Sequence, residues 1–136
     1  MALLLGSIIG LNRDINNKGT GLRTHAIVTL GSAVAVLSVT NTPNLEAINP
    51  DTVSRVIQGI LTGIGFLGAG VIIKNDNGHV SGLTTAATVW ISAVLGAACG
   101  SGHWTLIMTA FLFTILVLVF GGRVERIMEK ILKPLD

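Results

Sequence analysis

The chain has 136 residues, of which 50% are hydrophobic and only 12% are charged, and its net charge is +2. A soluble domain needs charged residues spread over its surface, whereas these charges are clustered between long uncharged runs. The composition therefore excludes an ordinary soluble domain, and the small basic excess predicts no nucleic-acid partner. The lone Cys99 excludes a disulfide within the chain.

The first uncharged run, residues 1–12, would cover only about 18 Å as a helix, which is too short to cross the roughly 30 Å apolar core of a bilayer. Either this helix is a partial span or the natural chain begins earlier. A signal peptide is the competing interpretation, but the run has no basic start and no convincing cleavage site.

The later uncharged runs are long enough to span a membrane. Together with the partial first helix they predict an all-α, polytopic membrane helix bundle with about five transmembrane helices. These helices form one predicted transmembrane domain at residues 1–122. The predicted spans are 1–12, 22–40, 53–73, 83–100 and 104–122.

Residues 123–136 predict a short amphipathic C-terminal helix, because apolar side chains recur there at helical spacing between basic ones. We expect this tail to lie at the cytoplasmic surface. It could rest on lipid, pair with a second copy or lead into a soluble domain, and the sequence does not choose among these.

The basic residues predict the orientation, since cytoplasmic loops of membrane proteins carry an excess of lysine and arginine. Eight of the nine basic residues fall on one side of the predicted bundle, and Arg55 alone falls on the other. With five spans, we predict a multi-pass protein that has its N-terminus outside and its C-terminus in the cytoplasm.

A polar group lies where the first predicted helix ends and the second begins. We expect its charged members to form a cluster that holds the second helix against the third. A plainer interpretation is that Arg23 reaches to the interface and that His25 is only a hydrogen-bonding residue at a helix end. The candidate residues of this group are Arg13, Asp14, Arg23, Thr24 and His25.

Glycines are dense in the third predicted helix, where five lie between Val56 and Ile73. Glycine weakens a soluble helix, but in a membrane it allows helix backbones to approach closely. We therefore predict tight packing at Gly59, Gly63, Gly65, Gly68, Gly70, Gly82 and Gly96. Small residues at the four-residue spacing typical of membrane seams are Gly6 and Gly10, Gly59 and Gly63, and Gly96 and Gly100.

Polar side chains on the third and fourth predicted helices are further candidates for binding. Arg55 either pairs with Asp51 one turn earlier or contacts a neighbouring helix. Thr84, Thr88 and Ser92 recur at four-residue steps and could line a narrow solute path beside the third helix. The candidate binding residues here are Arg55, Gln58, Thr62, Thr84, Thr85, Thr88 and Trp90.

Several kinds of chemistry are not predicted. Residues 63–68 spell G-x-G-x-x-G, but no βαβ unit surrounds them, so we expect no nucleotide cofactor. All seven acidic residues lie outside the predicted spans, so we expect no metal site. Because no carboxylate or histidine at membrane depth could activate a hydroxyl, we do not expect an enzyme.

Four blocks of the chain resemble the MgtC/SapB family of membrane proteins and occur in the family's order. They are Gly10-Leu11-x-Arg13, residues 21–26, Arg55 followed by residues 63–72, and residues 82–90. The resemblance implies a bacterial inner-membrane protein, several relatives of which support growth in low magnesium and survival of pathogens inside host cells. The best known relative is a regulator that inhibits the ATP synthase, rather than a magnesium transporter, so the resemblance implies a regulatory role.

The chain departs from the family pattern in two places. The family usually reads Gly-Leu-Glu-Arg where this chain has Asn12 before Arg13, so a carboxylate is missing and Asp14 is the nearest replacement. Many relatives also continue into a cytoplasmic domain that resembles ligand-binding regulatory folds, and no function of that domain is expected of these residues.

The expected function is regulation through contacts with other membrane proteins, in adaptation to magnesium limitation, virulence or stress. We expect the chain to sit in the lipid bilayer as a homo-oligomer, with a dimer favoured, and to contact a protein such as the ATP synthase. A small-solute or ion transporter or channel is the alternative. A third interpretation is binding of lipid or an anion at the basic cytoplasmic rim, through Arg13 and Arg23.

Overall fold

The computed structural model describes residues 1–41, 50–74 and 80–132 and confirms the predicted all-α class. Within these residues lie five helices and one antiparallel pair of two-residue strands. The helices are α1 (Ala2–Ile15), α2 (Leu22–Thr40), α3 (Pro50–Val71), α4 (Leu83–Ser101) and α5 (Trp104–Leu132), and the strands are β1 (Ile73–Lys74) and β2 (Val80–Ser81).

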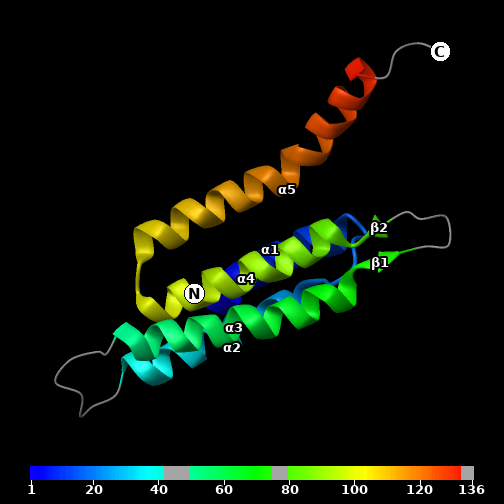
Figure 1. Cartoon of the computed structure of the whole chain (residues 1–136). Coiled ribbons are helices and arrows are strands. Elements are labelled where there is room, and N and C mark those ends of the chain that lie inside the picture. The colour runs from blue at the N-terminus through cyan, green and yellow to red at the C-terminus, as the bar shows by residue number, and fades with distance from the viewer. Residues whose placement is uncertain (42–49, 75–79, 133–136) are drawn as a thin grey trace.

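Four of the helices, α2 to α5, are long and apolar enough to cross a membrane. The helix α1 has 14 residues and falls short of a full span. The membrane character of the protein therefore rests on α2 to α5, and α1 lies against them as a shorter helix (Figure 1).

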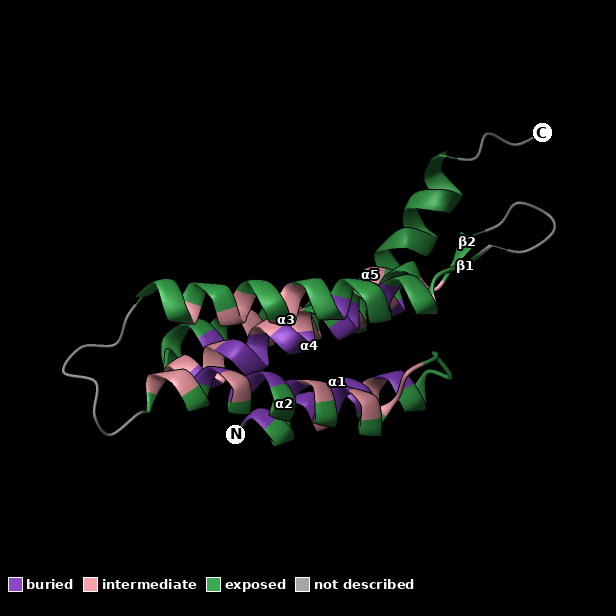
Figure 2. Ribbon diagram, turned by 60° about the horizontal axis from the view of Figure 1, so that its bottom comes forward, coloured by how far each residue is buried: buried purple, intermediate pink, exposed green. Residues whose placement is uncertain are grey.

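The helix α4 is the centre of the bundle, because it contacts each of the other four helices. It packs most extensively against α2, which in turn packs along α1. Figure 2 shows the buried surface concentrated on the facing sides of α1, α2 and α4, whereas most of α3 is exposed on its outer side. The enclosed part of the fold is thus a three-helix unit.

Glycines set both ends of α4. Gly82 precedes the helix with φ of +89°, and a Cβ atom there would stand 2.2 Å from the Val71 carbonyl oxygen. Gly102 ends the helix in the left-handed conformation with φ of +74°, which is the usual conformation of glycine after a helix C-terminus. The chain can therefore turn sharply into and out of α4 only because both positions lack a side chain.

Glycines also allow α2 to approach its two neighbours. A Cβ atom on Gly6 of α1 would lie 2.5 Å from the His25 carbonyl oxygen, and one on Gly96 of α4 would lie 2.3 Å from that of Thr29. Gly10 and Gly100 are as tightly enclosed, by Leu22 and by Ala33. Two of the three small-residue pairs thus form seams on either side of α2.

The helix α5 is the least enclosed. It packs against α4 and only slightly against α1, and Figure 1 shows its C-terminal part leading away from the other helices. No helix break separates the fifth predicted span from the predicted tail, since α5 continues through Gly121 and Gly122 to Leu132. Residues 133–136 of that tail lie outside the described residues.

Candidate functional site

A polar cluster is enclosed where α1, α2 and α4 meet. Arg13 of α1 is only 3% exposed, and its Nη2 donates a hydrogen bond to Oγ1 of Thr85, a buried residue of α4. His25 of α2 is 0% exposed. The structure therefore brings together three residues predicted as candidates, and it does so at the side of α4 that faces α1 and α2.

His25 is held by its own helix. Its Nδ1 lies 3.0 Å from the Gly21 carbonyl oxygen, whereas Nε2 has no hydrogen-bond partner among the described atoms. Asp14 lies close by, and its Oδ2 accepts a hydrogen bond of 2.9 Å from the Leu22 amide. Asp14 thus fixes the turn into α2, and both it and Arg13 lie within electrostatic range of His25.

Arg13 is the chemically unusual member of the cluster. Burial lowers the pKa of its guanidinium, but arginine stays charged at any physiological pH. Within the described residues no carboxylate forms an ion pair with Arg13, and its Nε atom is buried without a partner. The cluster therefore holds a positive charge whose compensation comes from one hydroxyl.

Arg23 and Thr24 do not join this enclosed cluster. Arg23 is exposed, and both residues line a separate shallow hollow with Asp14, Gly21 and Leu22. The predicted cluster is therefore divided, because Arg13 and His25 point into the bundle and Arg23 stays at the rim. The enclosed cluster was predicted to hold α2 against α3, whereas the hydrogen bond of Arg13 goes to Thr85 of α4.

The predicted polar path between α3 and α4 is not assembled by the described residues of these two helices. Thr88 and Ser92 of α4 are buried, and their hydroxyls donate to carbonyl oxygens of their own helix, each at 2.8 Å. Gln58 and Thr62 of α3 are exposed, and Thr62 likewise donates to the Gln58 carbonyl oxygen at 2.8 Å. The remaining candidates Arg55, Thr84 and Trp90 are exposed.

The helix α3 turns its glycines in two directions. Gly68 is buried and a Cβ atom on it would lie 3.6 Å from Cβ of Ala86 on α4. No described atom lies within 4 Å of a Cβ atom built on Gly59, Gly63, Gly65 or Gly70. The predicted packing role of these four is thus not met inside the chain and stays a prediction about contacts with other molecules.

Three of these glycines share a face with an aromatic residue. Gly59, Gly63, Phe66 and Gly70 recur at four, three and four residues, which places them on one side of a helix. The Phe66 side chain is 81% exposed, while Ile64 and Gly68, on the opposite side, are the buried residues of α3. We call the four-residue surface the glycine face of α3.

Sequence reasoning missed a basic pocket between the end of α1 and the middle of α5. Its cavity volume is about 530 Å³. The pocket could not be assembled from sequence because its two walls lie more than a hundred residues apart, although the loop charges already placed both on one side of the membrane. Its lining residues are Asn12, Arg13, Asn16, Lys18, Val119, Gly122, Arg123, Glu125 and Arg126.

Among residues 1–41, 50–74 and 80–132, no three histidine, cysteine or acidic side chains are grouped so that they could hold a metal ion. The described structure therefore offers three candidate functional features, namely the Arg13 cluster, the basic pocket and the glycine face.

Comparison with known proteins gives one consistent result. Residues 1–127 match the MgtC family. The chain is 42% identical over 137 residues to the protein SrpB of Synechococcus elongatus, an alignment that covers 93% of this chain and 74% of SrpB. No solved structure matches the chain.

Two further relatives are longer than this chain. The protein MgtC of Salmonella typhimurium is 44% identical over 117 residues, which cover 86% of this chain and 46% of that protein. The Escherichia coli protein named "Putative magnesium transporter YhiD" is 36% identical over 136 residues, covering 96% of this chain and 62% of YhiD. The chain thus spans about half to two thirds of the length of these two relatives.

Proposed function

This chain belongs to the MgtC family, and we propose that it is a regulator in the bacterial inner membrane that acts by binding other membrane proteins through the glycine face of α3. The observation that carries the proposal is that no described atom lies within 4 Å of a Cβ atom built on Gly59, Gly63 or Gly70, and that Phe66 beside them is 81% exposed. Regulation in adaptation to low magnesium or to stress is the role that the family resemblance implies.

The three small-residue pairs differ in their surroundings. The pairs in α1 and α4 are enclosed by α2, with a built Cβ atom less than 3 Å from a neighbouring atom at each position. The pair Gly59 and Gly63 has the same spacing but faces open space. Because such pairs allow close helix contact in membranes, the open pair is suited to a helix of another protein.

The distribution of charge supports an orientation with the C-terminus in the cytoplasm. The turn between α1 and α2, the strand pair and the C-terminal end of α5 lie at the same end of the bundle (Figure 1). These segments carry most of the basic residues of the chain. Since basic segments are retained on the cytoplasmic side, this end is proposed to face the cytoplasm.

The proposed occupant of the glycine face is a transmembrane helix of a different membrane protein, of which the ATP synthase is the example implied by the resemblance. Phe66 projects between Gly63 and Gly70 along the face and would fit a recess in the partner helix. A homodimer, which the sequence also predicts, is the competing occupant, and the following experiment separates the two.

Replacing Gly63 by leucine is expected to prevent partner binding without unfolding the chain, because the new side chain enters open space. A photo-crosslinking residue at position 66, activated in living cells, would capture the partner, and mass spectrometry would identify it. We expect a foreign membrane protein in the wild-type background and at least a tenfold loss of that product with Gly63→Leu.

Gly31→Leu is the matched control, since Gly31 of α2 is equally exposed and has no neighbour within 4 Å. It is expected to leave the crosslinked product unchanged. Crosslinks only to a second copy of the chain would replace the regulator proposal with a homodimer. A product that survives Gly63→Leu would show that the glycine face is not the binding surface.

Transport of a solute or ion is the second candidate function, and the name of the Escherichia coli relative favours it. Thr84 and Thr88 line a hollow of about 450 Å³ between α4 and α5. We propose this hollow as the path of a transported solute, although its lining residues other than Thr84, Thr88 and Thr114 are apolar. Magnesium uptake by vesicles that contain only this protein is the expected result for a transporter, and vesicles without uptake would reject it.

A further inference from the structure

We propose that the basic pocket between α1 and α5 binds a phosphate group. The pocket is separate from the glycine face, and no residue of α3 lines it. The inference is therefore independent of the proposed regulatory function and concerns a small ligand rather than a protein partner.

The charge of the lining selects an anion. Four basic side chains line the pocket and one acidic side chain, Glu125, opposes them. Within the described residues no ion pair joins Glu125 to any of the four, so their charges are not neutralised by the chain. The basic residues are Arg13, Lys18, Arg123 and Arg126.

Arg13 gives the second and independent observation. It is almost fully buried, it lines the pocket, and its Nε atom has no hydrogen-bond partner. A buried guanidinium nitrogen without an acceptor is energetically costly. Because Arg13 contacts Thr85 and also lines the pocket, an anionic oxygen in the pocket would add an acceptor for its guanidinium to the one that Thr85 provides.

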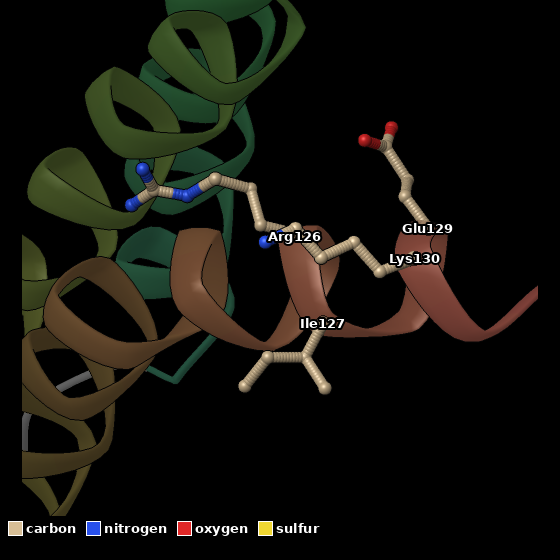
Figure 3. Close-up of a pocket in the computed structure, with 4 residues that line it drawn as sticks. All are labelled: Arg126, Ile127, Glu129 and Lys130. Atoms are coloured by element: carbon tan, nitrogen blue, oxygen red, sulfur yellow. The ribbon is translucent and has the colours of Figure 1, made fainter.

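The arginines of α5 are positioned to complete the site. Arg123 donates from Nη1 to the Val119 carbonyl oxygen at 2.9 Å, and Arg126 donates from Nε to that of Gly122 at 3.0 Å. Arg126 also lines a second, neighbouring hollow with Ile127, Glu129 and Lys130. Figure 3 draws that hollow and shows the Arg126 guanidinium turned back toward the other helices, while the Ile127 side chain points away and the Glu129 carboxylate lies apart from it. Each arginine keeps further N–H groups for a ligand.

These features favour phosphate over a carboxylate. Phosphate carries more charge, and arginine forks bind its oxygens in pairs. The side-chain amides of Asn12 and Asn16 add neutral donors to the same cavity. The source of the phosphate is either the headgroup of an anionic phospholipid, because basic pockets at the ends of membrane helices bind such headgroups, or free inorganic phosphate.

The test measures both sources on one purified sample in mild detergent. Native mass spectrometry would count phosphatidylglycerol molecules bound to each chain, and isothermal titration would measure binding of inorganic phosphate. We expect one of the two ligands to bind, and Arg123→Gln to weaken that binding by about tenfold or more because a charged hydrogen-bonding group is lost.

Lys130→Gln is the matched control, because it removes the same charge from the same helix but Lys130 does not line the pocket. It is expected to change affinity less than twofold. Equal losses of ligand affinity in the two variants would mean that only the general surface charge matters, and this would overturn the proposal. Binding of neither ligand would also overturn it. Preference for phosphatidylglycerol or for inorganic phosphate identifies the source.

Arg123→Gln is unlike a change in the core, because the Arg123 side chain is exposed and its hydrogen bond goes to the Val119 carbonyl oxygen of its own helix. Arg126→Gln provides a second variant on the same wall of the pocket. Both variants are expected to unfold at the same detergent concentration as the wild type. Weaker ligand binding in them would then come from the change in the pocket and not from unfolding.

Discussion

Replacing Gly96 by leucine is expected to separate α4 from α2 and to destabilise the folded state by about 3 kcal/mol. A Cβ atom at this position would stand 2.3 Å from the Thr29 carbonyl oxygen and 2.9 Å from Cβ of Ser32. The Thr29 carbonyl oxygen is a backbone atom, so no change of a side-chain rotamer can relieve this clash. Titration with sodium dodecyl sulfate, followed by tryptophan fluorescence, would show unfolding at a lower detergent fraction.

Gly31→Leu again serves as the control, since Gly31 lies on α2 with open space around it. The variant is expected to be as stable as the wild type or slightly more stable, because leucine favours helix by roughly 1 kcal/mol over glycine. If Gly96→Leu unfolds together with the wild type, the close approach of α2 and α4 is wrong. Loss of stability in both variants would instead point to a general intolerance of large residues.

Thr85→Val is the second change with a large expected effect. It keeps the shape of the side chain but removes the hydroxyl to which Arg13 donates. A hydrogen bond to a charged group contributes about 1.5 to 3 kcal/mol, and the buried guanidinium would lose its one side-chain acceptor among the described residues. We expect a loss of about 2 kcal/mol in the same detergent titration.

A double-mutant cycle tests the cause of that loss. Replacing Arg13 by methionine removes the charge that Thr85 compensates. The stability lost by the double variant should therefore be smaller than the sum of the two single losses, by about 1 kcal/mol or more. Thr109→Val is the control, because Thr109 is exposed and donates only to the Thr105 carbonyl oxygen of its own helix. Strict additivity in the cycle would show that the Arg13–Thr85 contact contributes nothing.

The helices could be predicted from sequence because their signals are local. Uncharged runs of eighteen or more residues define α2 to α5, and Gly82 and Gly102 bound α4 through their own backbone conformations. The start of α3 at Pro50, ahead of the predicted span at residues 53–73, follows from the tolerance of proline in a first helical turn.

The direction in which each helix faces could not be predicted in the same way. The pairs at Gly59 and at Gly96 have the same spacing and similar apolar neighbours, yet one faces open space and the other a backbone carbonyl. The difference arises from tertiary packing around α2 and has no local signal. For the same reason Thr88 and Ser92, which resemble a polar path in sequence, satisfy their hydroxyls within α4.

The contact between Arg13 and Thr85 also has a consequence for the order of biosynthesis. The two residues are separated by 72 positions, so Arg13 leaves the ribosome long before its acceptor exists. The α1–α2 hairpin can form early from neighbouring segments, but its buried charge is unsatisfied until α4 has entered the membrane. Insertion of α4 is thus the step at which the buried Arg13 side chain gains the Thr85 hydroxyl as its acceptor.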